Sequence, residues 1–258
     1  MNPIYFQGLL LIIALVTVLW VISVFLINVS IVDLFWGLGF VIVNSFYCYS
    51  SSTFSSRRIL LLVLVAVWGL RLSVYLALRN IGKGEDFRYR EFRKNYGERN
   101  YWWISYFQVF LLQGVLMWMI SSTLWGVNLF TEGESLNFTD YLGLLVWVIG
   151  FIFEAGGDYQ LTKFKNDPAN MGMVLNTGLW RFTRHPNYFG DAAIWWGYGI
   201  ICIASGGYWY VAGALLMTLL IIKVSGVALL EKTLKVKKPE YEDYVRKTSS
   251  FFPWFPKN

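Results

Sequence analysis

A polar stretch runs directly into an apolar segment at residues 178–191: Gly178-Leu179-Trp180-Arg181-Phe182-Thr183-Arg184-His185-Pro186-Asn187-Tyr188-Phe189-Gly190-Asp191. Pro186 suits the first turn of a helix, where its missing N–H costs nothing. Asn187 and Asp191 are four residues apart and share one face of that helix. Arg181 and Arg184 come just before the helix start, where free backbone N–H groups favour an anion. The pattern predicts a phosphate and ribose site at the mouth of a membrane helix. The alternative is a basic loop that meets lipid headgroups.

The composition is typical of a membrane protein. Of 258 residues, 56% are hydrophobic, 19% aromatic and only 15% charged, which is far from an average soluble domain. Long apolar runs predict a polytopic bundle in one membrane-embedded domain, residues 1–258. One His and two Cys, Cys48 and Cys202, are too few for a usual zinc or iron–sulfur site, so no metal is expected.

Seven apolar segments predict an all-α bundle of about seven transmembrane helices. They are residues 6–27, 31–49, 59–79, 104–125, 140–156, 187–204 and 208–230. The first lacks a basic n-region and a cleavage pattern, so it is expected to be a retained helix. Residues 1–156 are expected to wall the substrate cavity, and residues 157–258 to bind the cofactor. Arg57 and Arg58 are expected in a serine-rich loop.

Lys and Arg are divided unevenly between the two sides of such a bundle. Eighteen of the 22 fall on one side, in residues 79–103, 157–186 and 231–257, whereas the other side has Arg57 and Arg58 alone. By the positive-inside rule the rich side is cytoplasmic, so the N-terminus is expected outside and the C-terminus inside. The net charge of +6 is thus explained by topology, and no nucleic acid is expected as a partner.

Polar residues inside the apolar segments are costly in lipid and are therefore candidates for function. They include Asp33 beside Trp36 in the second segment, Arg71 in the third, Gln113 in the fourth and Glu154 in the fifth. These four polar residues lie toward the cytoplasmic side, whereas Lys223 lies deep in the seventh segment. They predict a polar pocket that opens to the cytoplasm. The alternative is a set of structural ion pairs such as Asp33–Arg71.

Two further polar segments are less specific. Residues 80–89 place two Gly around Lys83, which can let backbone N–H groups approach an anion. The segment lacks the ending of a P-loop, and a flexible basic loop is the alternative. The tail from Glu231 to Tyr244 predicts an interfacial helix with aromatic anchors, or a lid over the pocket.

These motifs together resemble a known superfamily. Arg184-His185-Pro186-Asn187-Tyr188-x-Gly190-Asp191, with Trp180 before it and Glu231 through Tyr244 after it, resembles the C-terminal signature of the steroid 5α-reductase, sterol reductase and isoprenylcysteine methyltransferase superfamily. With Asp33-x-x-Trp36-Gly37, Gly82-Lys83-Gly84-Glu85-Asp86 and Phe110-Leu111-Leu112-Gln113-Gly114, nearly the whole chain resembles the bacterial branch known as the DUF1295 family. The resemblance implies a location in an inner membrane.

The superfamily contains two chemistries. Its reductases bind NADPH and reduce a carbon–carbon double bond of a lipid, and its methyltransferases bind S-adenosylmethionine. Asn187 after the Pro and Asp191 after the Gly resemble the form of this motif that the reductases carry. The resemblance therefore implies an NADPH-dependent reductase of an apolar, steroid-like enone drawn from the bilayer. The alternatives are a methyltransferase of a lipid or lipidated thiol, and a non-catalytic lipid-binding or scaffold protein.

The resemblance also implies cofactor contacts. Asn187, Tyr188 and Asp191 would hold the nicotinamide and its ribose, and Trp180, Arg184 and His185 would line the pocket. Arg181 or Lys163 would lie near phosphate, with Lys83 and Arg88 as further phosphate contacts, while Glu231 and Tyr244 would close over the nucleotide. One departure is Lys237-Lys238-Pro239, where sterol reductases carry Lys-Tyr-Gly.

Catalytic residues follow from the same comparison. The 5α-reductases use a Glu on the second span and a Tyr on the third as the polarising and proton-donating pair. Here Asp33 takes the place of the acid. The third span offers Tyr75, although Trp68 aligns better with the Tyr position. The nicotinamide is expected beside Asp33, Trp36 and Arg71. A carboxyl kept protonated by an apolar site can donate a hydrogen bond, which makes Asp33 the expected donor.

Overall fold

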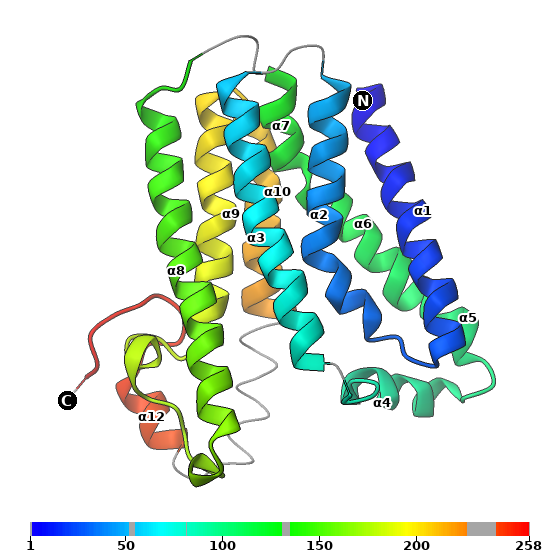
Figure 1. Ribbon diagram of the computed structural model, residues 1–258, viewed down its shortest axis with the longest axis vertical. Helices are drawn as coiled ribbons and strands as arrows, with labels where there is room; N and C mark the ends of the chain where they lie inside the picture. Colours follow the sequence, from blue (N-terminus) through cyan, green and yellow to red (C-terminus); the bar gives the residue numbers. More distant parts are fainter. Residues whose placement is uncertain (1, 52–54, 81, 131–134, 226–240, 258) are drawn as a thin grey trace. The chain divides into compact units, whose positions relative to one another are not determined.

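The computed structural model describes residues 2–51, 55–80, 82–130, 135–225 and 241–257. Helices account for all regular structure in these ranges, and no strand occurs among them, so the all-α prediction is confirmed (Figure 1). The chain forms two compact units. Unit 1 contains Met1–Leu136 and Ser205–Tyr210, and unit 2 contains Asn137–Ala204 and Val211–Asn258.

Unit 1 is built from long apolar helices and one short polar helix. In chain order these are α1 (Pro3–Leu26), α2 (Ile31–Ser50), α3 (Ser56–Asn80), the polar α4 (Phe87–Tyr96), α5 (Tyr101–Ser105), the π-helical turn η1 (Tyr106–Leu111), α6 (Leu112–Ile120) and α7 (Ser122–Phe130). Packing is closest between α2 and α3. A Cβ on Gly37 would come within 2.1 Å of the Gly69 carbonyl oxygen, so the two backbones meet where neither residue has a side chain.

Unit 2 is dominated by two long helices. Its elements are α8 (Phe138–Asn166), η2 (Pro168–Asn170), η3 (Gly178–Arg181), α9 (Pro186–Ala204), α10 (Ala212–Leu219), η5 (Leu220–Ser225) and α12 (Tyr241–Lys247), and η4 (Tyr208–Val211) joins the two units in sequence. Helices α8 and α9 meet along glycines. A Cβ on Gly190 would lie 2.3 Å from the Glu154 backbone nitrogen, which permits no side chain there.

Two local predictions were wrong. Arg57 and Arg58 lie in the first turn of α3 and are buried, with exposed fractions of 0% and 4%, instead of lying in a loop. The guanidinium of Arg58 donates to the Asn128 carbonyl at 2.7 Å, which offsets the cost of its burial. The fifth helix does not end at residue 156 but continues to Asn166. Gly157 there packs against Pro186 at the start of α9, so it marks a close approach and not a helix end.

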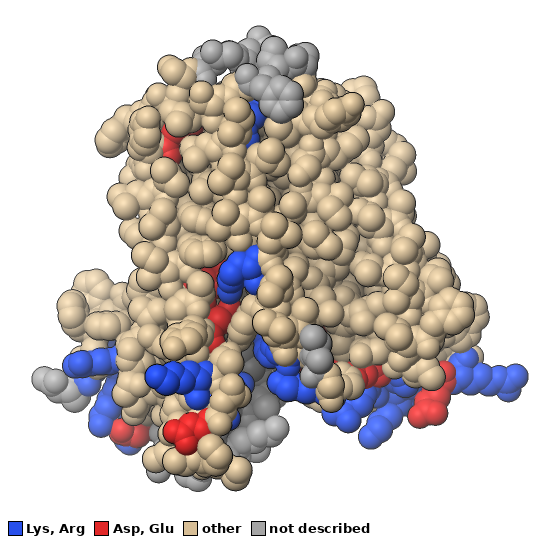
Figure 2. Space-filling model, viewed as in Figure 1, with Lys and Arg blue, Asp and Glu red and all other residues tan. Residues whose placement is uncertain are grey.

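Several helices have the length and composition of membrane spans. Among the described residues five qualify, which are Pro3–Leu26, Ile31–Ser50, Ser56–Asn80, Tyr101–Phe130 and Phe138–Asn166, and Tyr208–Val224 is a shorter apolar helix. Large apolar side chains on α1, such as Phe25 at 82% exposure, face outward, as expected next to lipid. Figure 2 shows many charged side chains gathered near α4, with a mostly uncharged surface above them. The length and composition of these helices confirm the prediction of a helical integral membrane protein.

Candidate functional site

The first candidate cluster centres on Asp33, in the first turn of α2. Both of its carboxylate oxygens accept hydrogen bonds from α4: the guanidinium of Arg88 donates at 2.8 Å and the hydroxyl of Tyr89 at 2.7 Å. Asp86 fixes these two residues because its side chain caps α4 and accepts from the Arg88 backbone N–H at 3.0 Å. Asp33 therefore accepts from both Arg88 and Tyr89, and in the pair that it forms with Tyr89 the proton lies on the phenol.

Gln113 connects Tyr89, which is bonded to Asp33, to Trp36. The Gln113 side-chain oxygen accepts from the indole N–H of Trp36 at 2.6 Å, and its amide nitrogen donates to the Tyr89 hydroxyl at 3.3 Å. Tyr89 is 5% exposed, so its hydroxyl is held from two sides within a nearly closed setting. Of the polar residues predicted to converge, Asp33 and Gln113 thus both contact Tyr89 in unit 1, whereas Glu154 belongs to unit 2.

A second acidic residue, Glu85, connects α4 to the turn before α2. Glu85 accepts two hydrogen bonds from the Arg93 guanidinium, at 3.0 and 2.8 Å, and one from the Val29 backbone N–H at 2.9 Å. The Asp86 backbone N–H donates to Ser30 at 2.6 Å. The turn before α4 is thereby tied to the turn between α1 and α2, which sets the position of the whole α4 helix.

Burial and neighbouring charges in this cluster shift the pKa values of Asp86 and Tyr89. Burial alone would raise the pKa of Asp86. The hydrogen bonds and the charge of Arg88 outweigh burial and lower this pKa below its ordinary value. Burial raises the pKa of the Tyr89 phenol, and the neighbouring Asp33 charge raises it further. The Tyr89 hydroxyl therefore keeps its proton at neutral pH.

The other predicted catalytic residues lie along α3. The ring of Tyr75 lies between two guanidinium groups, with Arg71 at 6.0 Å and Arg79 at 5.8 Å from its centroid. Trp68, fully buried, packs against Phe40 of α2 at 5.9 Å between ring centroids. Lys83 is exposed in the turn where Gly82 and Gly84 adopt positive φ, directly before α4. The flexible-loop alternative for residues 80–89 is thus wrong for residues 87–89, which are helical.

The motif of residues 180–191 forms the second candidate cluster, in unit 2. As predicted, Pro186 begins α9. The guanidinium of Arg184 is nearly buried and donates to the carbonyls of Val245 and Thr248, both at 2.9 Å, and its backbone N–H donates to Ser249. Arg184 therefore holds the C-terminal segment against the start of α9.

Aromatic residues continue this arrangement. Tyr244 of α12 donates from its hydroxyl to the Trp180 carbonyl, and the Trp180 indole donates to the Gly157 carbonyl of α8 at 3.2 Å. Burial raises the pKa of Tyr244 above its ordinary range, so the hydroxyl remains a donor. The ring of His185, 2% exposed, stacks on Tyr188 at 5.7 Å. Trp180 and Tyr244 are thus joined by a hydrogen bond, and His185 packs on Tyr188 at the start of α9.

Acidic groups of α8 face the start of α9. Asn187 donates from its side-chain amide to the Asp158 carboxylate at 3.1 Å, and Asp191 lies one helical turn further along. Asp158 and Glu154, one turn apart on α8, are 4% and 3% exposed. Arg181 and Lys163 are exposed cations of the same unit. Glu231 lies outside the described residues, as do residues 237–239.

Sequence reasoning missed Glu85, Tyr89 and Asp158. Tyr89 and Glu85 contact residues 56 positions away, and Asp158 lies in a stretch assigned to a loop. An acid directly before a short helix was the one available signal for the α4 cap at Asp86. Within the described residues, no group of three or more His, Cys, Asp or Glu could hold a metal ion.

Two units of apolar helices, each with a polar cluster near a helix start, define an all-helical membrane protein. Its family is shown by a match to the family model described as a protein of unknown function (DUF1295), which covers residues 19–248. The chain belongs to the DUF1295 family. An uncharacterized protein of Schizosaccharomyces pombe is 28% identical over 278 residues, covering 98% of this chain and 80% of the yeast protein. No solved structure matches the chain.

Proposed function

We propose that this protein is an NADPH-dependent reductase of a carbon–carbon double bond in an apolar, steroid-like enone lipid. The observation that carries the proposal is the acid–phenol pair of Asp33 and Tyr89, 2.7 Å apart. Reduction of an enone needs a proton to be supplied, whereas methyl transfer to a nucleophile needs one to be removed. A phenol that stays protonated at neutral pH suits the first requirement.

The roles of the unit 1 residues follow from their contacts. The single proton of the Tyr89 hydroxyl, which is donated to Asp33 here, would turn to the carbonyl oxygen of the bound enone and polarise it. Asp33 and Gln113 fix the orientation of that hydroxyl, and Arg88 holds Asp33 in place through its 2.8 Å contact. Trp36 helps to hold the Gln113 amide in place, because its indole N–H donates to the amide oxygen at 2.6 Å. This division of labour replaces the sequence-based proposal in which Asp33 itself donates.

Unit 2 contains the types of side chain that bind the sugar, carboxamide and phosphate groups of a dinucleotide. Asp158 and Asp191 supply carboxylate oxygens that can accept from sugar hydroxyls, and Asn187 supplies an amide for the carboxamide of the nicotinamide. Exposed Arg181 and Lys163 supply cations for phosphate, whereas Arg184 is engaged with backbone carbonyls. When bound, NADPH would supply the hydride that the β-carbon of the enone accepts.

The proposal includes a topology of seven spans in an inner membrane, with the N-terminus outside and the C-terminus in the cytoplasm. Five spans come from the long apolar helices. The 19-residue α9 and the apolar helix Tyr208–Val224 supply the other two. The concentration of Lys and Arg in residues 79–103, 157–186 and 231–257 supports this orientation.

Cofactor binding to the purified full-length protein tests the proposal. A ligand at one hundred times its Kd stabilises the folded state by about 2.7 kcal/mol, so NADPH is expected to raise the melting temperature and S-adenosylmethionine is not. Asp191→Ala should weaken the NADPH effect. Glu242→Ala, at an exposed position of α12, should leave it unchanged and serves as the control.

The alternatives make different predictions for the same measurement. Stabilisation by S-adenosylmethionine in place of NADPH would contradict the reductase and support a methyltransferase. Stabilisation by neither would support a non-catalytic lipid-binding or scaffold protein. A positive NADPH result is followed by NADPH oxidation assays with a panel of apolar enones, because a reductase must consume the cofactor in step with the saturated product.

A further inference from the structure

Three large aromatic side chains near the end of the chain are exposed in unit 2. Phe252, Trp254 and Phe255 are 70%, 72% and 76% exposed. Single exposed apolar residues are common on protein surfaces, but three large rings within four residues form a patch of the kind that marks an interaction site. We call these three side chains the aromatic patch. Neither the proposed reaction nor the proposed cofactor contacts use it.

The backbone that carries the aromatic patch has a defined shape. The Thr183 hydroxyl donates to the Phe251 carbonyl at 2.9 Å, and the Trp254 backbone N–H donates to the Phe182 carbonyl at 2.9 Å. Prolines on both sides of Trp254 and Phe255 restrict the backbone further, because their rings fix φ. The rings are therefore presented by a rigid loop, which loses little conformational entropy when its side chains are covered.

Ring contacts place the aromatic patch beside a lipid-facing helix. Phe252 packs on Phe189 in the first turn of α9, with 6.2 Å between ring centroids, and Phe189 packs on Phe153 of α8 at 5.1 Å. Helix α8 has the length and composition of a membrane span, and Ile152, next to Phe153, is 57% exposed. Figure 1 shows the C-terminal segment, coloured red, next to α8. The patch therefore begins at a level of α8 that faces lipid.

The apolar face of α8 ends close to the same level. Ile149, Ile152 and Tyr159 are exposed at helical spacing, and the exposed cation Lys163 follows Tyr159 one turn later. Ile152 and Lys163 are separated by about 16 Å along the helix axis. Aromatic rings are enriched where hydrocarbon gives way to headgroups, and lysine extends its ammonium toward water there. The aromatic patch thus lies at the boundary between the lipid tails and the headgroups.

Cations lie beside the aromatic patch. The Lys257 backbone N–H donates to the Lys247 carbonyl at 2.9 Å, so two lysines come together at the end of the loop. Asp243 pairs with the Lys247 ammonium at 3.0 Å. Arg181 is a third exposed cation, and it precedes Phe182, whose ring contacts the patch at 6.0 Å. Exposed aromatic rings next to cations are the composition of segments that lie in a membrane surface.

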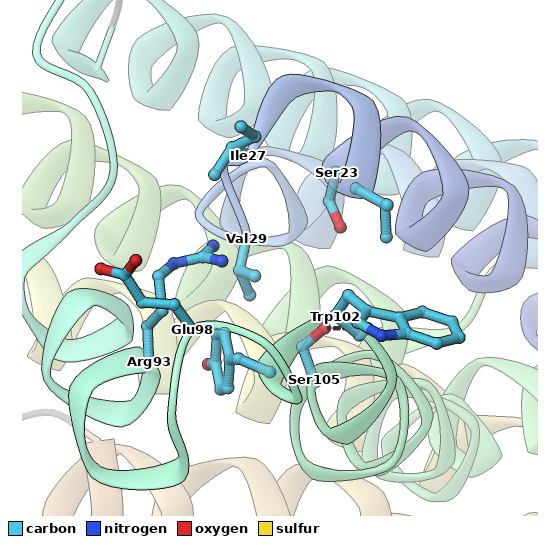
Figure 3. Close-up of a pocket in the computed structure, with 9 residues that line it drawn as sticks. Ser23, Ile27, Val29, Arg93, Glu98, Trp102 and Ser105 are labelled. Carbon is cyan, nitrogen blue, oxygen red and sulfur yellow. Dashed lines mark hydrogen bonds between the residues drawn. The ribbon is translucent and has the colours of Figure 1, made fainter.

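Unit 1 has a similar arrangement where α1 ends. A cavity of about 190 Å³ lies there, and Figure 3 shows the Arg93 side chain and the Trp102 ring on different sides of it. Trp102 and Ile27 at this cavity are 51% and 69% exposed. An exposed tryptophan near a cation therefore also marks the end of a membrane span in unit 1. This position provides an internal reference for the aromatic patch.

We propose that the loop of residues 251–255 is a membrane anchor. The three rings of the aromatic patch insert into the interfacial region of the bilayer that surrounds α8, and the neighbouring cations meet phospholipid headgroups. Lipid is the occupant because the patch continues the lipid-facing surface of α8. The bonds from Thr183 and to Phe182 connect this loop to the segment before α9, so the bilayer helps to position that segment.

Depth measurements on the full-length protein in phospholipid liposomes test the anchor. A nitroxide is attached to Trp254→Cys and Phe255→Cys, and its accessibility to oxygen, which concentrates in lipid, is divided by its accessibility to water-soluble NiEDDA. Ile152→Cys on the lipid-facing side of α8 and Glu242→Cys at an exposed position of α12 give the two extremes. Trp102→Cys gives the interfacial reference.

The ratios at residues 254 and 255 should lie well above that of Glu242→Cys and close to that of Trp102→Cys. Ratios equal to that of Glu242→Cys would overturn the anchor. Low accessibility to both reagents, with dipolar broadening between labels, would assign the patch to a contact with a second copy of the chain and would also overturn it. The wild type is the labelling control, because Cys48 and Cys202 are buried.

A charged substitution tests the anchor without a label. Phe255→Glu should be tolerated at a position that faces water, but it should drive the loop out of the bilayer. Amide exchange of residues 249–257 in liposomes should then become about tenfold faster, because the bond from the Trp254 N–H opens more often. Glu242→Gln on α12 is the control and should leave this exchange unchanged.

Unchanged exchange in Phe255→Glu would contradict the anchor. The variant is expected to keep its fold, because Phe255 is exposed, and its melting temperature in detergent checks this. None of these measurements involves a cofactor or an enone, so their outcome is independent of the proposed reductase activity.

Discussion

At the residue scale, the Tyr89 hydroxyl has two hydrogen-bond partners, one acceptor and one donor. It donates to Asp33 and accepts from the amide of Gln113, so its proton points along a defined direction. The Arg88 guanidinium is shared between Asp33 and Asp86, at 2.8 and 2.9 Å. Removal of one acid therefore leaves Arg88 paired with the other. This redundancy makes single substitutions here suitable for separating chemistry from folding.

Tyr89→Phe is expected to lower turnover of an enone by about a hundredfold or more, which is the usual contribution of a positioned general acid. The Kd for NADPH should stay the same, because Tyr89 belongs to unit 1, whereas the residues proposed to hold NADPH belong to unit 2. Steady-state kinetics and cofactor titration measure the two effects separately. Tyr96→Phe, at an exposed position of the same α4 helix, is the matched control. Wild-type turnover in Tyr89→Phe would exclude the phenol as the donor.

Asp33→Asn should also reduce turnover more than NADPH affinity, because a neutral amide no longer pairs with Arg88 and is a weaker acceptor for the Tyr89 hydroxyl, so the phenol loses its fixed position. The variant protein should still fold, since Asp86 continues to neutralise Arg88. A comparison of its melting temperature with that of the wild type checks this point. An intact fold with unchanged turnover would show that Asp33 does not orient Tyr89.

At the element scale, α4 depends on its cap at Asp86. The Asp86 side chain accepts from the backbone N–H and the guanidinium of Arg88, at 3.0 and 2.9 Å. Because the pKa of Asp86 is lowered from 3.8, the stability it contributes is complete above 3.8 and is lost as the pH falls through the lower folded value. Asp86→Ala should cost about 1 kcal/mol at neutral pH, visible as faster amide exchange in α4.

Asp86→Asn separates the cap from the charge. An Asn side chain caps a helix about as well as Asp but does not titrate. Amide exchange in α4 of Asp86→Asn should therefore lack the increase that the wild type shows below pH 3.8, once intrinsic exchange is corrected for. An identical acid response in both proteins would assign the pH dependence of α4 to another group.

The contact of α8 with α9 leaves no room for a side chain at Gly190. A Cβ there would meet backbone atoms of Glu154 and Gly150 at 2.3 and 2.5 Å, and backbone cannot rotate away. Gly190→Ala should destabilise unit 2 by roughly 1–3 kcal/mol, as overpacking does. Gly199→Ala on the same helix meets Val211 and Ala214 only at 3.4 and 3.5 Å. It should be neutral or slightly stabilising in the same thermal unfolding measurement.

These elements also show which features a sequence reveals. The bounds of α2 and α9 agree with the prediction within one residue, because apolar runs end at clear signals such as Pro186. Long-range partners leave no local trace. In the alternative of structural ion pairs Asp33 would pair with Arg71, but Asp33 contacts Arg88 and Tyr89, whose position depends on how α4 folds back. Burial of Arg58 depends likewise on Asn128, which is 70 residues away.

At the scale of the whole molecule, the proposed topology rests on charge. Cytoplasmic segments of membrane proteins carry an excess of Lys and Arg, and eighteen of the 22 lie in three segments that alternate with the predicted spans. An even number of spans must therefore separate residue 94 from residue 247. Residues 138 and 209 should lie on the opposite side of the membrane from both. This arrangement does not depend on the chemistry of either candidate site.

Single cysteines at exposed positions test this topology with a membrane-impermeant maleimide applied to intact cells. Phe138→Cys and Trp209→Cys, at sites with 82% and 91% exposure, should be labelled from outside. Lys94→Cys and Lys247→Cys should be labelled only after the membrane is permeabilised. The wild type is the control, because Cys48 and Cys202 are both buried and should not react. Labelling of Lys94→Cys and Lys247→Cys from opposite sides would contradict seven spans, and exchange of all four results would reverse the orientation.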